Sequence, residues 1–281
     1  MGPEDRYAKR LSYEPGRLVR AIGEPIRVGS MLWVFTDPHR GHEFAYNRWY
    51  ERDHYFAGCM IGANTLAGSR WVATRRHKEA RLPHVPTMPF GRLDGSYACL
   101  YFILDGQHDA WDAWAAPQMH ELYAADRGFQ GRTHYNTGFW RADWRAYRDP
   151  DPVPVELALD HRYPGMVAMF VDQRRGAPAA GLDEVLESIL PTWLPGSPVA
   201  SVAAWSHVPL SDRKPDFIDA DPAATDRRLL VHFVEADPLE VWDRFRDLTA
   251  EIDRSGAGTV ALAAPFVATE VGTDRYVDEL W

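Results

Sequence analysis

Cysteine is scarce, since the 281-residue chain contains only Cys59 and Cys99. Two thiols cannot form a disulfide framework or a cysteine-based metal site, so both are predicted to be small core residues. The sequence also lacks an apolar run of the roughly 20 residues that a membrane-spanning helix needs, and it shows no signal peptide. We therefore expect a cytoplasmic protein with no membrane partner.

Basic charge is scarce as well. Lys and Arg number 31 against 40 Asp and Glu, which gives a formal net charge of -9. Nucleic-acid binding requires basic patches, so nucleic acid is not an expected partner. No P-loop or G-x-G-x-x-G follows a predicted strand. His39 and His42 of "HRGH" have no third ligand nearby in the sequence, so no metal is expected.

Aromatic residues, in contrast, are abundant, with 11 Trp, 12 Tyr and 12 Phe. Such side chains fill cores, and they also line pockets that bind apolar ligands. A small apolar or aromatic molecule is therefore the expected partner.

Strand-like and helix-like segments follow each other in an order that occurs twice. The first occurrence predicts strands at 30–37, 69–76, 96–105 and 133–144, with helices at 44–58 and 108–128. The second predicts strands at 165–173, 199–210, 227–237 and 259–271, with helices at 181–194 and 238–256. Pro117 is expected to kink its helix, and Gly128 and Gly256 are expected to cap theirs.

This order divides the chain into an N-terminal arm (1–29), a first module (30–147), a Pro- and Asp-rich linker (148–164) and a second module (165–281). Each module has the β-α-β-β-α-β order of a ferredoxin-like unit. Strands such as "MVAMFV" are apolar on both faces, so the face away from the helices must also be covered. We predict an α+β fold in which the two sheets pack face to face as a barrel. The alternative is that loops or a second chain cover this face of each sheet.

The helix at 44–58 carries the first candidate site. On an α-helical wheel Asn47, Tyr50 and His54 lie on one side, with Phe56 on the same inward half. A histidine can take a proton near neutral pH, and a phenol or an amide can hold an oxyanion beside it. The alternative is structural: His54 and Asp53 brace the helix end, and Tyr50 is a core aromatic.

The strand "THYNTGFW" carries the second candidate site. Strand alternation predicts that His134 and Asn136 share one face and that Tyr135 points to the other. Either His134 and Asn136 line a pocket or they are solvated residues at the start of a strand. His207 and His232 are predicted to be hydrogen-bonded core residues.

The letters "FAYNRWYERDH" place Asn47, Trp49, Tyr50 and His54 in the pattern N-x-W-Y-x-x-x-H. In this pattern and in its order of elements, the chain resembles the dimeric α/β-barrel superfamily and, within it, the EthD-like group. The resemblance covers residues 31–144, and the second half matches in element order only. The ending "APFVATEVGTDRYVDELW" is similar to that of tandem-duplicated actinobacterial proteins of this length. The superfamily includes cofactor-free cyclases, cofactor-free monooxygenases and haem enzymes with one axial histidine.

We therefore expect a cofactor-independent enzyme of the cyclase, dehydratase/lyase or isomerase type, acting by acid–base catalysis on a small polyketide, aromatic or terpenoid intermediate. The expected catalytic residues are Tyr50, His54, His134 and Asn47. Asn136 is expected to orient the substrate, with walls formed by Trp49, Trp71, Trp111, Trp140 and Phe139. The alternatives are a haem- or hydrophobic-ligand-binding protein and a cofactor-free monooxygenase of the same fold. A homodimer is also compatible with the sequence.

Overall fold

The computed structural model describes residues 25–176, 181–210 and 226–281, so most of the predicted N-terminal arm lies outside the described residues. The strands are β1 (Val28–Pro38), β2 (Thr65–Val72), β3 (Tyr97–Leu104), β4 (Arg132–Tyr147), β5 (Gly165–Gln173), β6 (Val199–Val208), β7 (Arg227–Val234) and β8 (Gly258–Ala268). The helices are α2 (Glu43–Trp49), α3 (Arg75–Ala80), α4 (His108–Ala124), α5 (Gly181–Trp193) and α6 (Trp242–Ser255), with the π-helix η1 (Tyr50–Met60) and the 3-10 helices η2 (Val155–Leu157) and η4 (Pro238–Val241). None of the described helices is long and apolar enough to cross a membrane.

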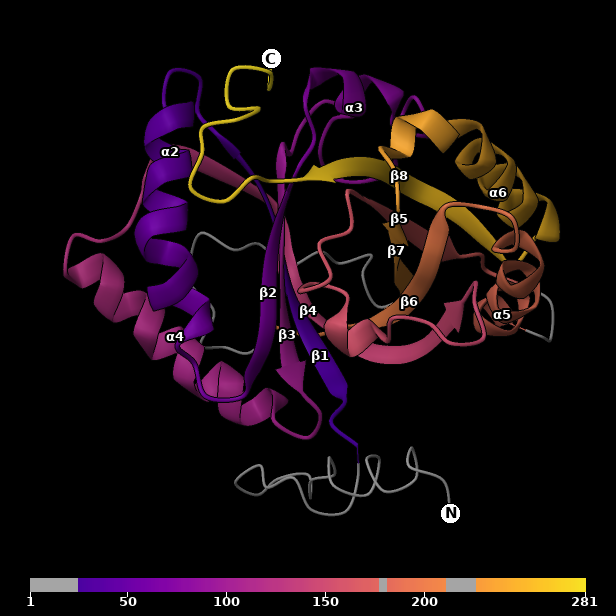
Figure 1. Ribbon diagram of the computed structural model, residues 1–281, viewed down its shortest axis with the longest axis horizontal. Helices are drawn as coiled ribbons and strands as arrows, with labels where there is room; N and C mark the ends of the chain where they lie inside the picture. The colour runs from indigo at the N-terminus through magenta and orange to yellow at the C-terminus, as the bar shows by residue number, and fades with distance from the viewer. Residues whose placement is uncertain (1–24, 177–180, 211–225) are drawn as a thin grey trace.

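The described strands form one closed antiparallel barrel in the order β1-β3-β2-β8-β5-β7-β6-β4. The helix α2 with η1, together with α4, lies outside β1 to β4, whereas α5 and α6 lie outside β5 to β8 (Figure 1). The predicted α+β class is therefore confirmed. The outer face of the first four strands, beneath α2, η1 and α4, is the part of the fold that forms the candidate site.

Several predicted boundaries need correction. The strand predicted at 69–76 is β2 at Thr65–Val72, and the residues that follow it form the short helix α3. The helix α4 is continuous through Pro117 and ends at Ala124, so Gly128 is not its cap. Gly256 does cap α6, because it takes the left-handed conformation, at φ 73°, that glycine adopts without strain.

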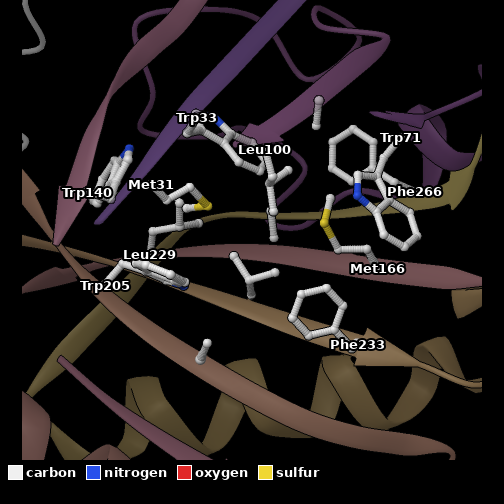
Figure 2. Packing of buried hydrophobic residues seen from close by; sticks show 14 of the residues in the cluster. Met31, Trp33, Trp71, Leu100, Trp140, Met166, Trp205, Leu229, Phe233 and Phe266 are labelled. Atoms are coloured by element: carbon white, nitrogen blue, oxygen red, sulfur yellow. The ribbon is translucent and has the colours of Figure 1, made fainter. Parts of the chain in front are cut away.

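Large apolar side chains fill the barrel interior. Trp33, Trp71, Trp140 and Trp205 are all at most 1% exposed and belong to one buried cluster. Figure 2 shows them meeting methionine, leucine and phenylalanine side chains from several strands of the ring. This interior cluster explains why the strands are apolar on both faces, since the outward faces pack against the helices.

The predicted linker is part of this packing. Val155, Leu159 and Tyr163 are each at most 5% exposed and join the interior cluster. Glu156 fixes the segment, because its carboxylate accepts hydrogen bonds from Arg145 Nη1 at 2.5 Å and from the Val28 amide at 3.3 Å. Residues 155–163 therefore act as a packed element and not as a free connection.

The two halves of the chain meet at two seams of unequal length. At one seam β4 and β6 pair from Phe139 to Tyr147 around a register shift. At the other, the paired residues are Trp71 with Ala268 and Val72 with Val267. The second seam is much shorter, and the C-terminal segment lies beside it (Figure 1).

Candidate functional site

A cavity of about 90 Å³ lies between the outer face of β1 and β4 and the helices η1 and α4. Its walls are mostly apolar, with Leu32, Val34, Trp111, Met119 and Phe139 among them. The polar side chains that line it are Tyr50, His54, Asp112, Arg132, His134 and Thr137. An apolar pocket with a few convergent polar groups is the usual form of a small-molecule site.

The π-helical winding of η1 brings His54 to this cavity. In a π-helix the backbone bonds to the fifth residue along, as in the 3.1 Å bond from the Ile61 amide to Phe56 O. Residues five apart therefore lie above one another, and the His54 ring stacks on Trp49 at 4.3 Å between centroids. The α-helical wheel placed Phe56 inward. That prediction is wrong, since the side chain is 53% exposed.

His54 is held neutral in the cavity. Burial, and after it the Arg132 guanidinium, lowers the pKa of His54 to about 3. Among the described residues no side chain or backbone group makes a hydrogen bond to either ring nitrogen. Gly58 leaves room for the ring, because a Cβ added there would lie 3.1 Å from His54 Nδ1 and 3.1 Å from Met119 Cε.

Tyr50 forms the inner wall beside His54, with their ring centroids 5.3 Å apart. Its hydroxyl shares a 2.6 Å hydrogen bond with the Tyr101 hydroxyl. Burial raises the pKa of Tyr50 well above its ordinary value, so the phenol stays protonated. Tyr50 and His54 are thus adjacent, as their spacing predicted.

A β-bulge decides which β4 side chains reach the cavity. Phe35 pairs with Asn136, whereas the next residue, Thr36, pairs with His134, so Tyr135 is an extra residue in β4. Cross-strand partners share a face, and Phe35 points into the barrel. Asn136 therefore faces the interior while His134 faces the cavity, so the prediction that the two share a face is wrong.

Arg132 anchors the polar side of the cavity. Its Nε donates to His134 Nε2 at 2.9 Å, and its Nη2 donates to the Tyr123 hydroxyl at 2.5 Å. Its guanidinium carbon also lies 4.8 Å from the centre of the Trp49 ring, within range of a cation–π contact. Burial, then Arg132 and His54, holds the pKa of His134 well below its usual range. The cavity therefore contains two neutral imidazoles beside a fixed cation.

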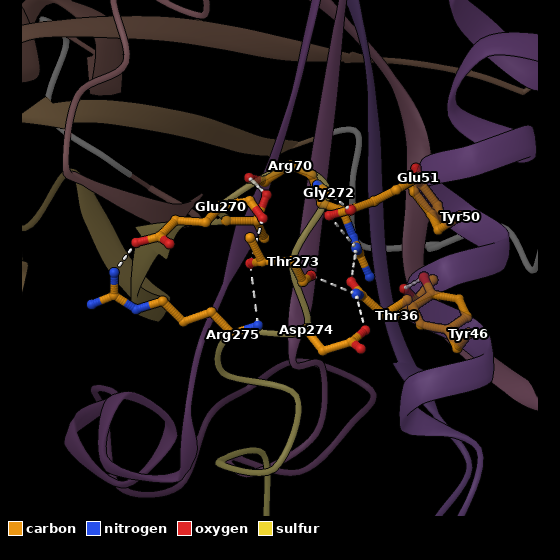
Figure 3. Close-up of polar contacts among 12 residues, drawn as sticks. Thr36, Tyr46, Tyr50, Glu51, Arg70, Glu270, Gly272, Thr273, Asp274 and Arg275 are labelled. Carbon is orange, nitrogen blue, oxygen red and sulfur yellow. Dashed lines mark hydrogen bonds and ion pairs between the residues drawn. The ribbon is translucent and has the colours of Figure 1, made fainter.

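Asn47 lies outside the cavity, in a polar cluster on the other side of η1. Its Oδ1 accepts from Arg70 Nη1 at 2.6 Å, and its Nδ2 donates to Thr273 O at 2.9 Å. Figure 3 labels these two partners, Arg70 and Thr273. Arg70 is buried against the ring of Tyr97, with 3.9 Å from its guanidinium carbon to the ring centre. This cluster ties the first helix to the C-terminal segment. Both polar groups of Asn47 are engaged there, away from the cavity.

The predicted aromatic wall is divided between two places. Trp111 and Phe139 line the cavity, and Trp49 backs His54. Trp71 and Trp140 lie on the opposite face of their strands, in the barrel interior. Arg132 and Thr137 also line the cavity, although neither was predicted. Arg132 precedes His134 by two residues and shares its face by strand alternation, whereas Thr137 reaches that face through the bulge.

His207, His232 and Cys99 do not line this cavity, whereas Cys59 does. The His207 ring packs against Trp140, with 5.5 Å between ring centroids. His232 is 0% exposed, and its Nδ1 donates to Val167 O at 3.1 Å, as expected of a core histidine. Cys59 and Cys99 are buried and unbridged. Within the described ranges no group of three or more His, Cys, Asp or Glu side chains could hold a metal ion.

A second, wider hollow of about 970 Å³ lies across η1 from the cavity, beside the short β2–β8 seam, and Tyr50 reaches both. Its lining is rich in charged residues, most of which pair with one another. Arg76 pairs with Asp237, and Arg275 pairs with Glu270. Because these charges neutralise each other, the hollow offers less chemistry than the cavity around His54.

No protein-family model matches the sequence, and no curated protein matches it either. Among solved structures, the chain is similar to a protein provisionally named chlorite dismutase, with a TM-score of 0.50 and 9% identity over 91% of this chain and 100% of that one. It is also similar to an anthrone oxidase-like protein, with a TM-score of 0.48 and 10% identity over 89% of this chain and 98% of that one. A provisionally named monooxygenase from Fusobacterium nucleatum aligns with a TM-score of 0.45 and 10% identity over 86% of this chain and 94% of that one. The first likeness shows the fold alone, and the two below 0.5 support no conclusion.

That likeness is to the same barrel fold, whereas membership of the dimeric α/β-barrel superfamily and of its EthD-like group stays a prediction. Haem is the one cofactor that the resemblance implies as an alternative. Its size can be compared with the volume of the cavity. Pockets for drug-sized ligands measure about 300–1,000 Å³, and a haem is larger than most such ligands. The 90 Å³ beside His54 and His134 does not fit the macrocycle.

Proposed function

We propose that the protein is a cofactor-independent acid–base enzyme of the cyclase, dehydratase/lyase or isomerase type, acting on a small, mostly apolar substrate. The observation that supports this most is the neutral His54 imidazole, which lines an apolar cavity without a hydrogen-bond partner among the described residues. We also propose that residues 30–147 hold the site and that residues 165–281 mainly close the barrel. An EthD-like origin, a cytoplasmic location and a homodimer remain part of the proposal.

In the proposed reaction, His54 takes a proton from the carbon next to a substrate carbonyl. The electron pair of that C–H bond moves to the carbonyl oxygen and forms an enolate. The negative charge of the enolate favours the imidazolium, which burial and Arg132 otherwise disfavour. Return of the proton to a different atom gives isomerisation, and loss of a leaving group from the enolate gives elimination. Tyr50 and His134 stay neutral and shape the polar wall.

The test needs no knowledge of the natural substrate. A panel of small enolisable ketones is incubated in D₂O, and exchange of the α-hydrogens is followed by NMR. The wild-type protein should accelerate exchange of at least one ketone above the buffer rate. His54→Ala should lower that acceleration on the order of 10²-fold or more, the usual contribution of a general base.

His120→Ala is the matched control, because His120 is exposed on α4 and has no part in the cavity. It should exchange the ketones at the wild-type rate, and thermal unfolding should show that both variants fold. Exchange at the buffer rate with every ketone, or full activity in His54→Ala, would reject the acid–base assignment.

A hydrophobic-ligand-binding protein is the second candidate, and the largely apolar lining favours it. It predicts that a ketone binds in the cavity and shifts the resonances of its walls, while its α-hydrogens exchange at the buffer rate.

A further inference from the structure

Thr137 lies at the cavity wall although nothing in the sequence marks it. It is 8% exposed and pairs across the strands with Val34, which also lines the cavity. Without the extra residue at Tyr135, strand alternation would place His134 and Thr137 on opposite faces. The bulge puts both side chains on the cavity side, where His134 Nδ1 and Thr137 Oγ1 are 2.9 Å apart.

The hydrogen bonds of His134 fix the direction of that contact. Arg132 has only donors, so the 2.9 Å bond from its Nε makes His134 Nε2 the acceptor. A neutral imidazole that accepts at Nε2 carries its proton on Nδ1. The contact with Thr137 is therefore a donation from His134 Nδ1–H to the threonine oxygen.

This direction determines what the Thr137 hydroxyl can do. A hydroxyl has one hydrogen, and a bond received at the oxygen leaves that hydrogen for another acceptor. No acceptor for it lies among the described residues, and Thr137 lines the cavity. The missing acceptor belongs in the cavity that Thr137 lines.

We propose that Thr137 donates a hydrogen bond to the carbonyl oxygen of the ligand, and that the cavity takes small ketones with an apolar body. The reaction rests on the proposed function, in which the enolate oxygen formed by His54 would receive the same bond. Arg132 and His134 act as positioning residues that hold the hydroxyl in its donor orientation. The volume of about 90 Å³ limits the ligand, since a 150 Å³ cavity is known to hold benzene.

The test compares two ligands of the same shape, 2-butanone and 2-methyl-1-butene, in which a methylene group replaces the carbonyl oxygen. Their affinities are measured by NMR titration of the wild-type protein, Thr137→Val and Thr137→Ser. The wild type should bind the ketone about five- to tenfold more tightly than the alkene, the usual effect of one buried hydrogen bond. Thr137→Val should lose this preference, and Thr137→Ser should keep it.

The proposal fails if the wild type shows no preference, if neither ligand binds, or if Thr137→Val prefers the ketone as strongly as the wild type does. These outcomes are separate from those of the exchange experiment. A protein that prefers the ketone but never exchanges its α-hydrogens supports the role of Thr137 and rejects the acid–base function. Exchange by Thr137→Val at the wild-type rate and with the wild-type KM would overturn the role of Thr137 alone.

Discussion

His232 makes the stability of the fold sensitive to mild acid. Its ring is 0% exposed and packs between Trp193 and Phe245, with centroids 5.9 and 5.3 Å away. Nδ1 donates to Val167 O, so Nε2 carries a lone pair that has no donor among the described residues. Burial lowers the pKa of His232 from its model-compound value of 6.5 to about 4.

The sign and size of the effect follow from proton linkage. The unfolded chain protonates His232 near pH 6.5, whereas the folded protein does so only near pH 4. The unfolded state binds more protons between these values, so the stability is full above about pH 6.5 and falls as the pH approaches 4. The whole loss is about 3 kcal/mol, at 1.36 kcal/mol per pKa unit, with about 2 kcal/mol of it between pH 7 and 5.

Urea unfolding followed by tryptophan fluorescence measures this loss between about pH 7 and pH 5, where carboxylates remain mostly ionised. His232→Phe keeps an aromatic ring between Trp193 and Phe245 and removes the titration. The variant gives up the bond to Val167 O, worth about 1 kcal/mol, at every pH. From about pH 7 to about pH 5, the free energy of unfolding should therefore decrease by about 2 kcal/mol less in the variant than in the wild type. Parallel pH profiles for the two proteins would refute the reasoning.

Other perturbations separate the site from the scaffold. Gly58→Ala should abolish ketone binding in NMR titrations, because its Cβ meets His54, while thermal unfolding shows stability within about 1 kcal/mol of wild type. Normal ketone binding would contradict this. Leu100→Ala should cost about 2–5 kcal/mol in urea unfolding through a cavity in the barrel interior, yet leave ketone affinity unchanged. Arg70→Leu should cost about 3–5 kcal/mol by leaving Glu51 buried without its cation, and a loss below about 1 kcal/mol in urea unfolding would argue against this.

The order of elements and the neighbouring positions of Tyr50 and His54 could be predicted because they follow from apolar periodicity and residue spacing. The winding of η1 could not. Sequence patterns distinguish helix from strand, but the choice between closing a turn at the fourth or the fifth residue depends on packing against β2 and α4. That choice exposes Phe56 and places His54 over Trp49.

The bulge at Tyr135 limited the prediction of the second polar cluster. Strict alternation assigns His134 and Asn136 to one face, and a single inserted residue reverses this for every position beyond it. Thr137 was missed for the same reason. Its role depends on a register shift and on the proton position of a neighbouring imidazole, and neither has a signature in residue type.

The short β2–β8 seam has a consequence for synthesis on the ribosome. β8 is the last of the described strands to emerge, and until it pairs at Trp71 and Val72 the ring remains an open sheet. While only β1 to β4 have emerged, their inner face presents Trp33, Trp71 and Trp140 with no opposing strands to cover them. The nascent first half is thus an aggregation-prone intermediate because its apolar face is exposed. A truncated chain ending near residue 147 should aggregate instead of folding alone.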